Sequence, residues 1–375
     1  MSLPRISIVR RTEDIPKWLP LVTTLGAVVL AFLIGAIILA SIGANPLYIY
    51  SYFFRGSFGS LGSFSDVMVK ASPLILIGLG CSLAFKMKLW NIGAEGQFFM
   101  GAFMASLVPL VPLVPLDTTP KFIVLLMMAL LGMIGGALYG FIPGVLKAKF
   151  NINEIIVTLM LNYIVVFWNN YWIFGKWTDA GFQMTKTFSK TAWLPRLADY
   201  ATQIKAFSGI TLHAGVLFGL IAALIVHIIL NHSNWGYMIN LIGDNPRAAR
   251  YAGADIAKNT ILVFMLSGAF AGLAGMVEVS GVVHRLQERI SVSYGFSGVI
   301  VAWLAKLNPW AVIVVSILFG GLIVASREIQ PSGISFLLQG IILFLVISSD
   351  VLLKYKFQIV RSGKNVKTVN EEVSA

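Results

Sequence analysis

Long apolar segments dominate this chain and leave few folds open to it. Blocks of Leu, Ile, Val and Phe recur along its 375 residues, and only 12% of the residues are charged. A soluble domain of this length has about a quarter charged residues, and a helix of about 20 apolar residues spans a bilayer. The chain is therefore expected to be an all-α integral membrane protein with about ten transmembrane helices. The predicted spans are 18–41, 69–86, 89–108, 122–146, 155–175, 213–231, 259–281, 293–306, 309–326 and 334–353.

The basic residues predict an orientation for these spans. The formal net charge is +12, and most Lys and Arg residues stand in segments that would be cytoplasmic if both termini are inside. We expect a cytoplasmic segment 1–17, a transmembrane domain 18–353 and a cytoplasmic tail 354–375. Because the basic residues lie in short loops between apolar blocks, their distribution does not suggest nucleic-acid binding.

A long polar segment, 176–212, divides the predicted spans into two groups of five. An odd number of spans in each group inverts one half relative to the other, so two inverted five-helix halves are expected. The aromatic segment 45–66 is expected at the outer membrane interface. Glycines four residues apart, at 132–144 and 268–272, predict close contacts between helices.

Sequence patterns for catalysis are missing. There is no Walker A motif, no His-Glu-x-x-His motif and no nucleophile elbow, and the four histidines are scattered. We expect no enzyme activity, no metal site and no cofactor in this chain.

The first candidate site is a polar motif after the second predicted span. Asn91, Glu95 and Gln97 alternate with glycines in Asn-Ile-Gly-Ala-Glu-Gly-Gln, at the edge of the apolar region. A glutamate at membrane depth is costly unless it is paired. These side chains either line a solute pathway or form the start of an interfacial helix, where Glu95 would favour the positive end of the dipole.

The second candidate site is a polar stripe along the fifth predicted span. Glu154, Thr158, Asn162 and Asn169 lie within about 80° of one another on a helical wheel. The stripe is expected to face other helices or a wet cavity, as part of the solute pathway or in hydrogen bonds between helices. Neutral amides suit an uncharged polar solute better than an ion.

The third candidate site lies in the predicted cytoplasmic loop 232–258. Asp244 or Asn245 can cap a helix that has Pro246 at its first position and stops at Gly253. Such a short helix in the cytosol either docks into a partner or is an ordinary loop helix.

These motifs together resemble a known family. The run Gly-Asp-Asn-Pro-x-Ala-Ala-x-Tyr-Ala-Gly at 243–253 resembles the coupling-helix loop of the permease subunits of bacterial ABC importers. The motif at 91–97, the block Asn-Glu-Ile-Ile-x-Thr-Leu-Met-Leu-Asn-Tyr at 153–163 and the glycine-rich block 267–275 are similar to one branch. That branch is the simple-sugar and nucleoside permeases of the branched-chain amino acid/ribose permease family.

The resemblance implies a function for the chain. It would be the transmembrane permease of an importer for a nucleoside, with a purine nucleoside favoured, or for ribose or another simple sugar. Its location would be the bacterial cytoplasmic membrane. A carrier driven by an ion gradient is the alternative from another class, with Glu95 and Glu278 as its candidate carboxylates.

The resemblance also implies partners. These are an ABC ATPase that binds ATP and Mg, a second and different permease subunit, and an extracytoplasmic solute-binding lipoprotein. The residues implied to contact the ATPase are Gly243, Asp244, Asn245, Pro246, Ala248, Ala249, Tyr251 and Gly253. The outer loop 176–212 is longer and richer in lysine than the family pattern.

Overall fold

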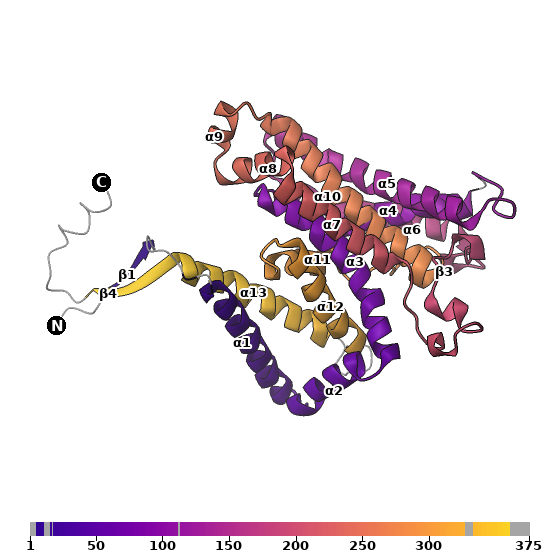
Figure 1. Ribbon diagram of the computed structural model, residues 1–375, viewed down its shortest axis with the longest axis horizontal. Helices are drawn as coiled ribbons and strands as arrows, with labels where there is room; N and C mark the ends of the chain where they lie inside the picture. The colour runs from indigo at the N-terminus through magenta and orange to yellow at the C-terminus, as the bar shows by residue number, and fades with distance from the viewer. Residues whose placement is uncertain (1–4, 11–15, 17, 112, 327–332, 361–375) are drawn as a thin grey trace.

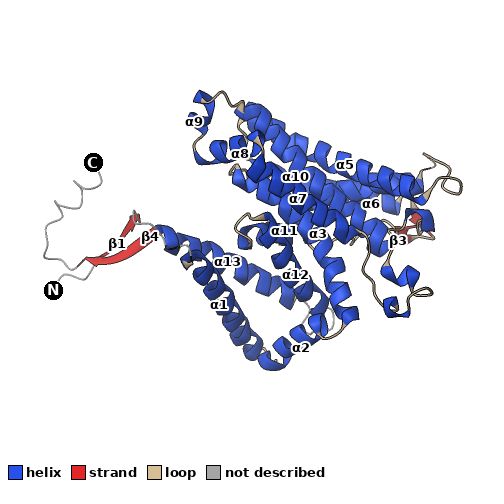
Figure 2. Cartoon of the chain, viewed as in Figure 1, coloured by secondary structure: helices blue, strands red, loops and turns tan. Residues whose placement is uncertain are grey.

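The computed structural model describes residues 5–10, 16, 18–111, 113–326 and 333–360. Helices make up most of the described chain, with two short two-stranded sheets (Figure 2). The helices are α1 (Leu19–Ser41), α2 (Pro46–Phe58), α3 (Leu61–Lys86), α4 (Ala94–Leu110), α5 (Lys121–Phe150), α6 (Glu154–Phe174), α7 (Gly215–His232), α8 (Asn234–Asp244), α9 (Pro246–Tyr251), α10 (Ile256–Glu278), α11 (Tyr294–Leu304), α12 (Pro309–Ala325) and α13 (Ile334–Lys354).

Every predicted span contains a helix, which confirms the helical membrane-protein class. Among the described residues, six helices are long and apolar enough to cross a bilayer, namely those at 22–41, 61–86, 121–150, 154–174, 215–232 and 256–283. Helices α2, α4, α8, α9, α11 and α12 are shorter, and α11 has only 11 residues.

Several helix boundaries differ from the prediction. Segment 45–66 forms α2 and the first turns of α3, because Asn45 and Ser60 cap these helices with their side chains. The helix predicted from residue 89 begins at Ala94, since Lys88 has a left-handed backbone (φ 56°) that ends α3. Helix α8, which Ser233 caps, was not predicted from the sequence.

The centre of the bundle is formed by α3 and α10, which are the most buried of the six long helices (Figure 1). Helices α4 and α5 pack on α10, and α11 and α12 pack on α3. Glycines allow the closest approach: a Cβ on Gly136 of α5 would collide with the carbonyl oxygen of Gly268 on α10. The glycine spacing thus marks a real helix contact, as expected.

The two ends of the described chain lie together. Strand β1 (Arg5–Arg10) pairs antiparallel with β4 (Tyr355–Val360), and α1 packs beside α13. The expected all-α fold therefore carries a small sheet within segments assigned to the two cytoplasmic tails. Figure 1 places β1, β4 and α9 toward the left, and β3 (Phe182–Thr185) toward the right.

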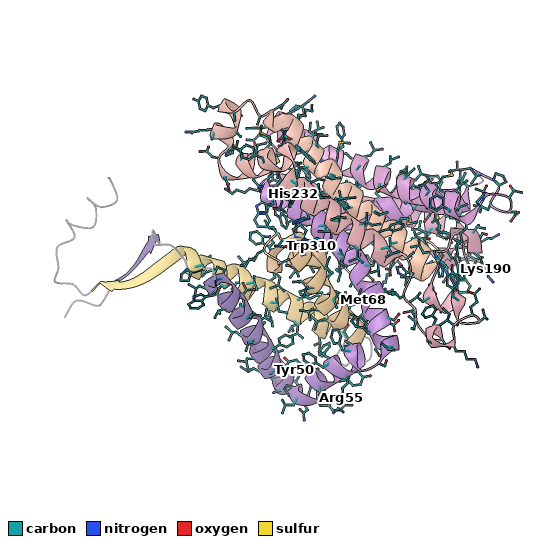
Figure 3. All side chains as sticks on the ribbon, viewed as in Figure 1. Tyr50, Arg55, Met68, Lys190, His232 and Trp310 are labelled. Carbon is teal, nitrogen blue, oxygen red and sulfur yellow. The ribbon has the colours of Figure 1, made fainter. Side chains whose placement is uncertain are left out.

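The long loop between α6 and α7 is folded onto the bundle. It contains β2 (Thr178–Asp179), β3 and the 3-10 turns η1 (Lys190–Ala192), η2 (Leu197–Tyr200) and η3 (Lys205–Phe207). Leu194 N–H donates to the carbonyl of Ser280, beyond the end of α10. Figure 3 shows Lys190 of this loop at one end of the bundle and His232, which ends α7, toward the other.

Candidate functional site

The polar motif at 91–97 forms a buried hydrogen-bonded cluster where α3 gives way to α4. Asn91 Nδ2 donates to Gln97 Oε1 and to Ser267 Oγ of α10, both at 2.8 Å. Gln97 Nε2 donates back to Asn91 Oδ1 at 3.2 Å. All three side chains are buried, so the motif ties the break between α3 and α4 to the central helix α10.

Asn162 of α6 completes the start of α4. The residue before α4 is Gly93, which has no side chain to cap the first turn. Asn162 Oδ1 accepts from Gly96 N–H at 2.8 Å, and its Nδ2 donates to the carbonyl of Ile92 at 3.0 Å. Asn162 therefore caps a helix to which it does not belong.

Glu95 connects the two short helices near the centre of the bundle. Its Oε2 accepts from the Gly295 N–H, in the first turn of α11, at 2.6 Å. The carboxylate thus lies at the N-terminus of α11 as well as in the first turn of α4, where helix dipoles favour negative charge. A Cβ on Gly295 would collide with the Glu95 backbone, so glycine is needed there.

The polar stripe of α6 faces the bundle, as predicted. Glu154, Thr158, Asn162 and Asn169 are all buried. Glu154 pairs with Lys147 at 2.9 Å, and Thr158 packs against Gly93. Five of the six expected pathway residues therefore lie near the start of α4. They are Asn91, Glu95, Gln97, Thr158 and Asn162. Asn169 lies two turns farther along α6 and only donates to Val165 O in its own helix.

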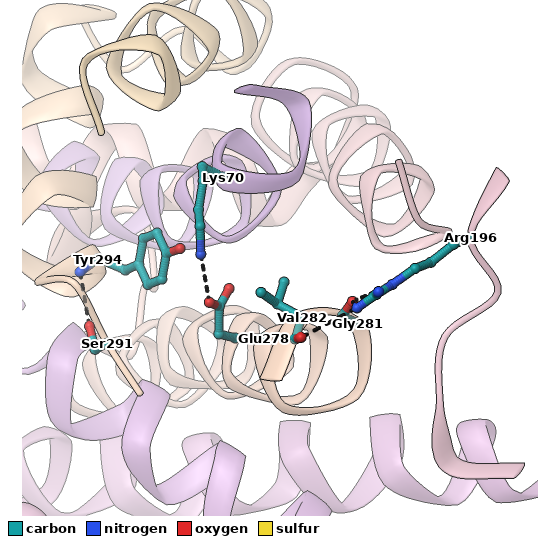
Figure 4. Close-up of polar contacts among 7 residues, drawn as sticks. All are labelled: Lys70, Arg196, Glu278, Gly281, Val282, Ser291 and Tyr294. Atoms are coloured by element: carbon teal, nitrogen blue, oxygen red, sulfur yellow. Dashed lines mark hydrogen bonds and ion pairs between the residues drawn. The ribbon is translucent and has the colours of Figure 1, made fainter. Parts of the chain in front are cut away.

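A second buried polar cluster lies beyond these motifs, toward the long loop 176–212 (Figure 4). Lys70 Nζ of α3 contacts Glu278 Oε1 of α10 at 2.8 Å, and both side chains are at most 7% exposed. The Lys70 ammonium also lies 5.5 Å from the centre of the Tyr294 ring. From the sequence, Glu278 was predicted only as a candidate carboxylate of an ion-driven carrier. A lysine within the predicted span 69–86 was the signal that could have revealed its partner.

The long loop 176–212 is anchored just after Glu278. Val279–Val283 forms a π-helical turn, and Arg196 donates to the carbonyls of Gly281 and Val282, with Nη2 2.6 Å from Gly281 O (Figure 4). His284 stacks on Trp193, with ring centres 3.8 Å apart. Burial, followed by the nearby Arg196 charge, lowers the pKa of His284 to about 4.

The loop 232–258 contains the short helix expected from its sequence. Asn245 caps α9 by accepting from the N–H groups of Arg247 and Ala248, and Pro246 is its first residue. Gly253 has φ +82°, which suits a helix end. Asp244 instead ends α8, and Gly243 packs against the carbonyl of Lys86 at the end of α3.

Most of the α9 loop is available to a partner. Asp244, Asn245 and Pro246 are exposed and Ala248 is half-buried, whereas Gly243 and Ala249 are buried. Tyr251 is 94% exposed. Among the residues that the structure describes, no group of three His, Cys, Asp or Glu residues could hold a metal ion.

Comparison with known proteins places these features in a family. The family model described as "Branched-chain amino acid transport system / permease component" matches residues 63–347. The guanosine ABC transporter permease protein NupP of Bacillus subtilis is 31% identical over 92% of this chain and 98% of its own length. The nucleoside ABC transporter permease protein NupB of Lactococcus lactis is 32% identical over 82% of this chain and 84% of its own length.

A sugar permease is also similar. The glucose ABC transporter permease protein TsgB13 of Haloferax volcanii is 29% identical over 92% of both chains. No solved structure matches this chain. Because the family model covers well over half of the sequence, the chain belongs to the family of permease components of branched-chain amino acid transport systems.

Proposed function

We propose that this chain is the permease subunit of an ABC importer that carries a nucleoside, with a purine nucleoside favoured, into a bacterial cell. The observation that carries the proposal is its similarity to the guanosine permease NupP over 92% of this chain. The buried neutral amides of Asn91, Gln97 and Asn162 fit a pathway for an uncharged solute, because they offer donors and acceptors without charge.

The same proposal gives the chain ten crossings with both termini in the cytoplasm. The pairing of β1 with β4 supports it, since an even number of crossings brings both ends to one side. Two inverted halves are supported by repeated contacts. Helix α3 packs on α11 and α12 as α10 packs on α4 and α5, and α4 contacts α6 as α11 contacts α13.

In this proposal, α9 and the residues around it are the coupling element. The exposed stretch Asp244–Arg247 and the exposed Tyr251 offer a contact surface for the cytoplasmic ATPase, which binds ATP and Mg. Gly243, whose Cβ would meet the carbonyl of Lys86, passes movement from this loop to the end of α3. Since α3 leads into the motif at 91–97, a displaced α9 would act on the start of α4.

The remaining partners follow from the proposed importer. A second, different permease subunit would pack against this chain in the bacterial cytoplasmic membrane. An extracytoplasmic solute-binding lipoprotein would dock on the folded outer loop 176–212. Asn91, Glu95, Gln97, Thr158, Asn162 and Asn169 would frame the inner part of the solute pathway.

A simple sugar is the second candidate solute. The similarity to the glucose permease of Haloferax volcanii, over 92% of both chains, favours it. A carrier driven by an ion gradient fits less well, because the chain belongs to a permease family and Glu278 is held by Lys70.

Uptake measurements test the proposal. Labelled guanosine, adenosine, ribose and glucose are given to cells with and without the gene, each before and after ATP depletion that preserves ion gradients. Gene-dependent nucleoside uptake that stops on ATP depletion is expected. Uptake that persists until an ionophore is added would refute an ABC importer, and gene-dependent uptake of sugars alone would refute the nucleoside.

A further inference from the structure

The Lys70–Glu278 pair lies between two interrupted helices. Glu278 is the last residue of α10 before the π-helical turn 279–283, and Tyr294 is the first residue of α11. Figure 4 shows the Lys70 side chain of α3 pointing toward Glu278 and lying beside the Tyr294 ring. Interrupted helices in transporters commonly hold the solute, and π-helical turns are frequent at functional sites.

One carboxylate oxygen of the Lys70–Glu278 pair can still accept hydrogen bonds. Two buried charges are costly to remove from water, and the contact between Nζ and Oε1 offsets that cost only in part. Glu278 is 2% exposed, and its Oε2 has no hydrogen-bond partner among the described residues. A carboxylate accepts several hydrogen bonds, so Oε2 remains open to a donor from outside the chain. Because the pair is neutral overall, it suits an uncharged solute.

His213 supplies a matching donor beside it. The Gly215 N–H donates to His213 Nδ1 at 3.0 Å, so a neutral imidazole carries its proton on Nε2. This Nε2 is buried without a partner among the described residues, in a side chain that is 3% exposed. The ring packs against Gly281, three residues after Glu278.

We propose that Glu278 and His213, with Lys70 holding Glu278 in place, form a contact site for the vicinal hydroxyls of the transported solute. A hydroxyl group donates one hydrogen bond and accepts others, so it satisfies Glu278 Oε2 and His213 Nε2–H together. The inference rests on the proposed importer function only in taking the solute to be a hydroxylated ring. Nucleosides and simple sugars share that chemistry.

The site explains why a lysine and a glutamate lie buried toward the outer loop. When the pathway opens outward, the solute's hydroxyls replace water as partners of Glu278 and His213. Solutes without these hydroxyls would leave the buried Glu278 Oε2 without a hydrogen bond, and a site built to hydrogen-bond a hydroxyl rejects such solutes strongly. A hydrogen bond to a charged group corresponds to a preference of about 10- to 100-fold for the hydroxylated solute.

The test compares two solutes in two variants of the whole transporter in cells. Maximal uptake rates of labelled guanosine and 2′,3′-dideoxyguanosine are measured at saturating concentrations, with permease levels in the membrane determined by immunoblot. Glu278→Gln is expected to reduce the preference for guanosine by about 10-fold or more. Glu154→Gln is the matched control, because it also removes a buried carboxylate from a lysine pair and lies at the opposite end of the bundle. It should slow both solutes equally.

A structural role or a gating role predicts a different result. If Glu278→Gln slows both solutes by the same factor, the contact site is refuted. If the variant does not reach the membrane, His213→Asn decides the question, since Asn Oδ1 can accept from Gly215 N–H while nothing replaces Nε2–H. That variant should also lose preference for guanosine, and an unchanged preference would refute the site.

The same design separates this inference from the proposed function. If uptake depends on the gene only for ribose or glucose, the nucleoside proposal fails, and the sugar is compared with its 2,3-dideoxy form in the same variants. A reduced preference in Glu278→Gln then still supports the site. If the gene supports uptake of none of the four solutes, both proposals fail.

Discussion

Replacing Asn162 with leucine should destabilise the bundle at the start of α4. Leucine has a similar size but leaves Gly96 N–H and the Ile92 carbonyl without the partners that Asn162 supplies at 2.8 and 3.0 Å. Each buried backbone group left unpaired costs about 1–3 kcal/mol, so the loss should be about 2–6 kcal/mol. At about 2–4 °C per kcal/mol, the melting temperature of the purified transporter should fall by roughly 4–24 °C.

Asn169→Leu provides the matched control. Asn169 is also a buried amide of α6, but it donates only to Val165 O of its own helix, at 2.9 Å. Its removal leaves no other helix unpaired, so a much smaller change is expected. Both variants are followed by thermal unfolding in the same detergent. Equal melting temperatures for the two variants would refute the view that Asn162 caps α4.

Three further predictions concern the coupling loop, the helix packing and the outer loop. Ala248→Glu should uncouple ATP hydrolysis from transport while the protein stays in the membrane, and unchanged uptake would contradict the coupling role of α9. Gly136→Val should prevent α5 from packing on α10 and abolish a monodisperse gel-filtration peak, whereas Gly26→Val, which meets no atom within 4 Å, should not. The pKa of His284 is lowered to about 4, so stability should be full above about pH 6.5 and fall toward pH 4. His284→Phe should reduce that fall in melting curves, and an identical pH profile would contradict it.

The sequence was sufficient for the helices and for the inward faces of its polar motifs. Each apolar block predicted to span the bilayer contains a helix, since a helix satisfies its own backbone hydrogen bonds within lipid. The positions of Asn91 and Gln97 within one cluster could also be expected, because both stand in the same short motif. Asn245 and Pro246 predicted α9 through local capping, which requires no knowledge of the rest of the fold.

Contacts between distant segments were beyond such reasoning. Gly96 and Asn162 are 66 residues apart, and Lys70 and Glu278 are 208 residues apart. Nothing local indicates which partner a buried polar group will find. Helix ends were also missed where the backbone turns left-handed at Lys88, a conformation that its residue type does not favour. The pairing of β1 with β4 joins opposite ends of the chain, and neither strand has a partner nearby in sequence.

The packing of α1 on α13 has a consequence for biosynthesis. Helix α1 is made long before its main partner α13, since the two helices are separated by nearly 300 residues. Until α13 has been synthesised, the face of α1 that packs on α13 is therefore exposed to lipid, and α2 is the neighbour already present. A chain that stops before residue 334 leaves α1 without its neighbour, so quality-control proteases that recognise unpaired membrane helices would be offered the N-terminal span of every truncated product.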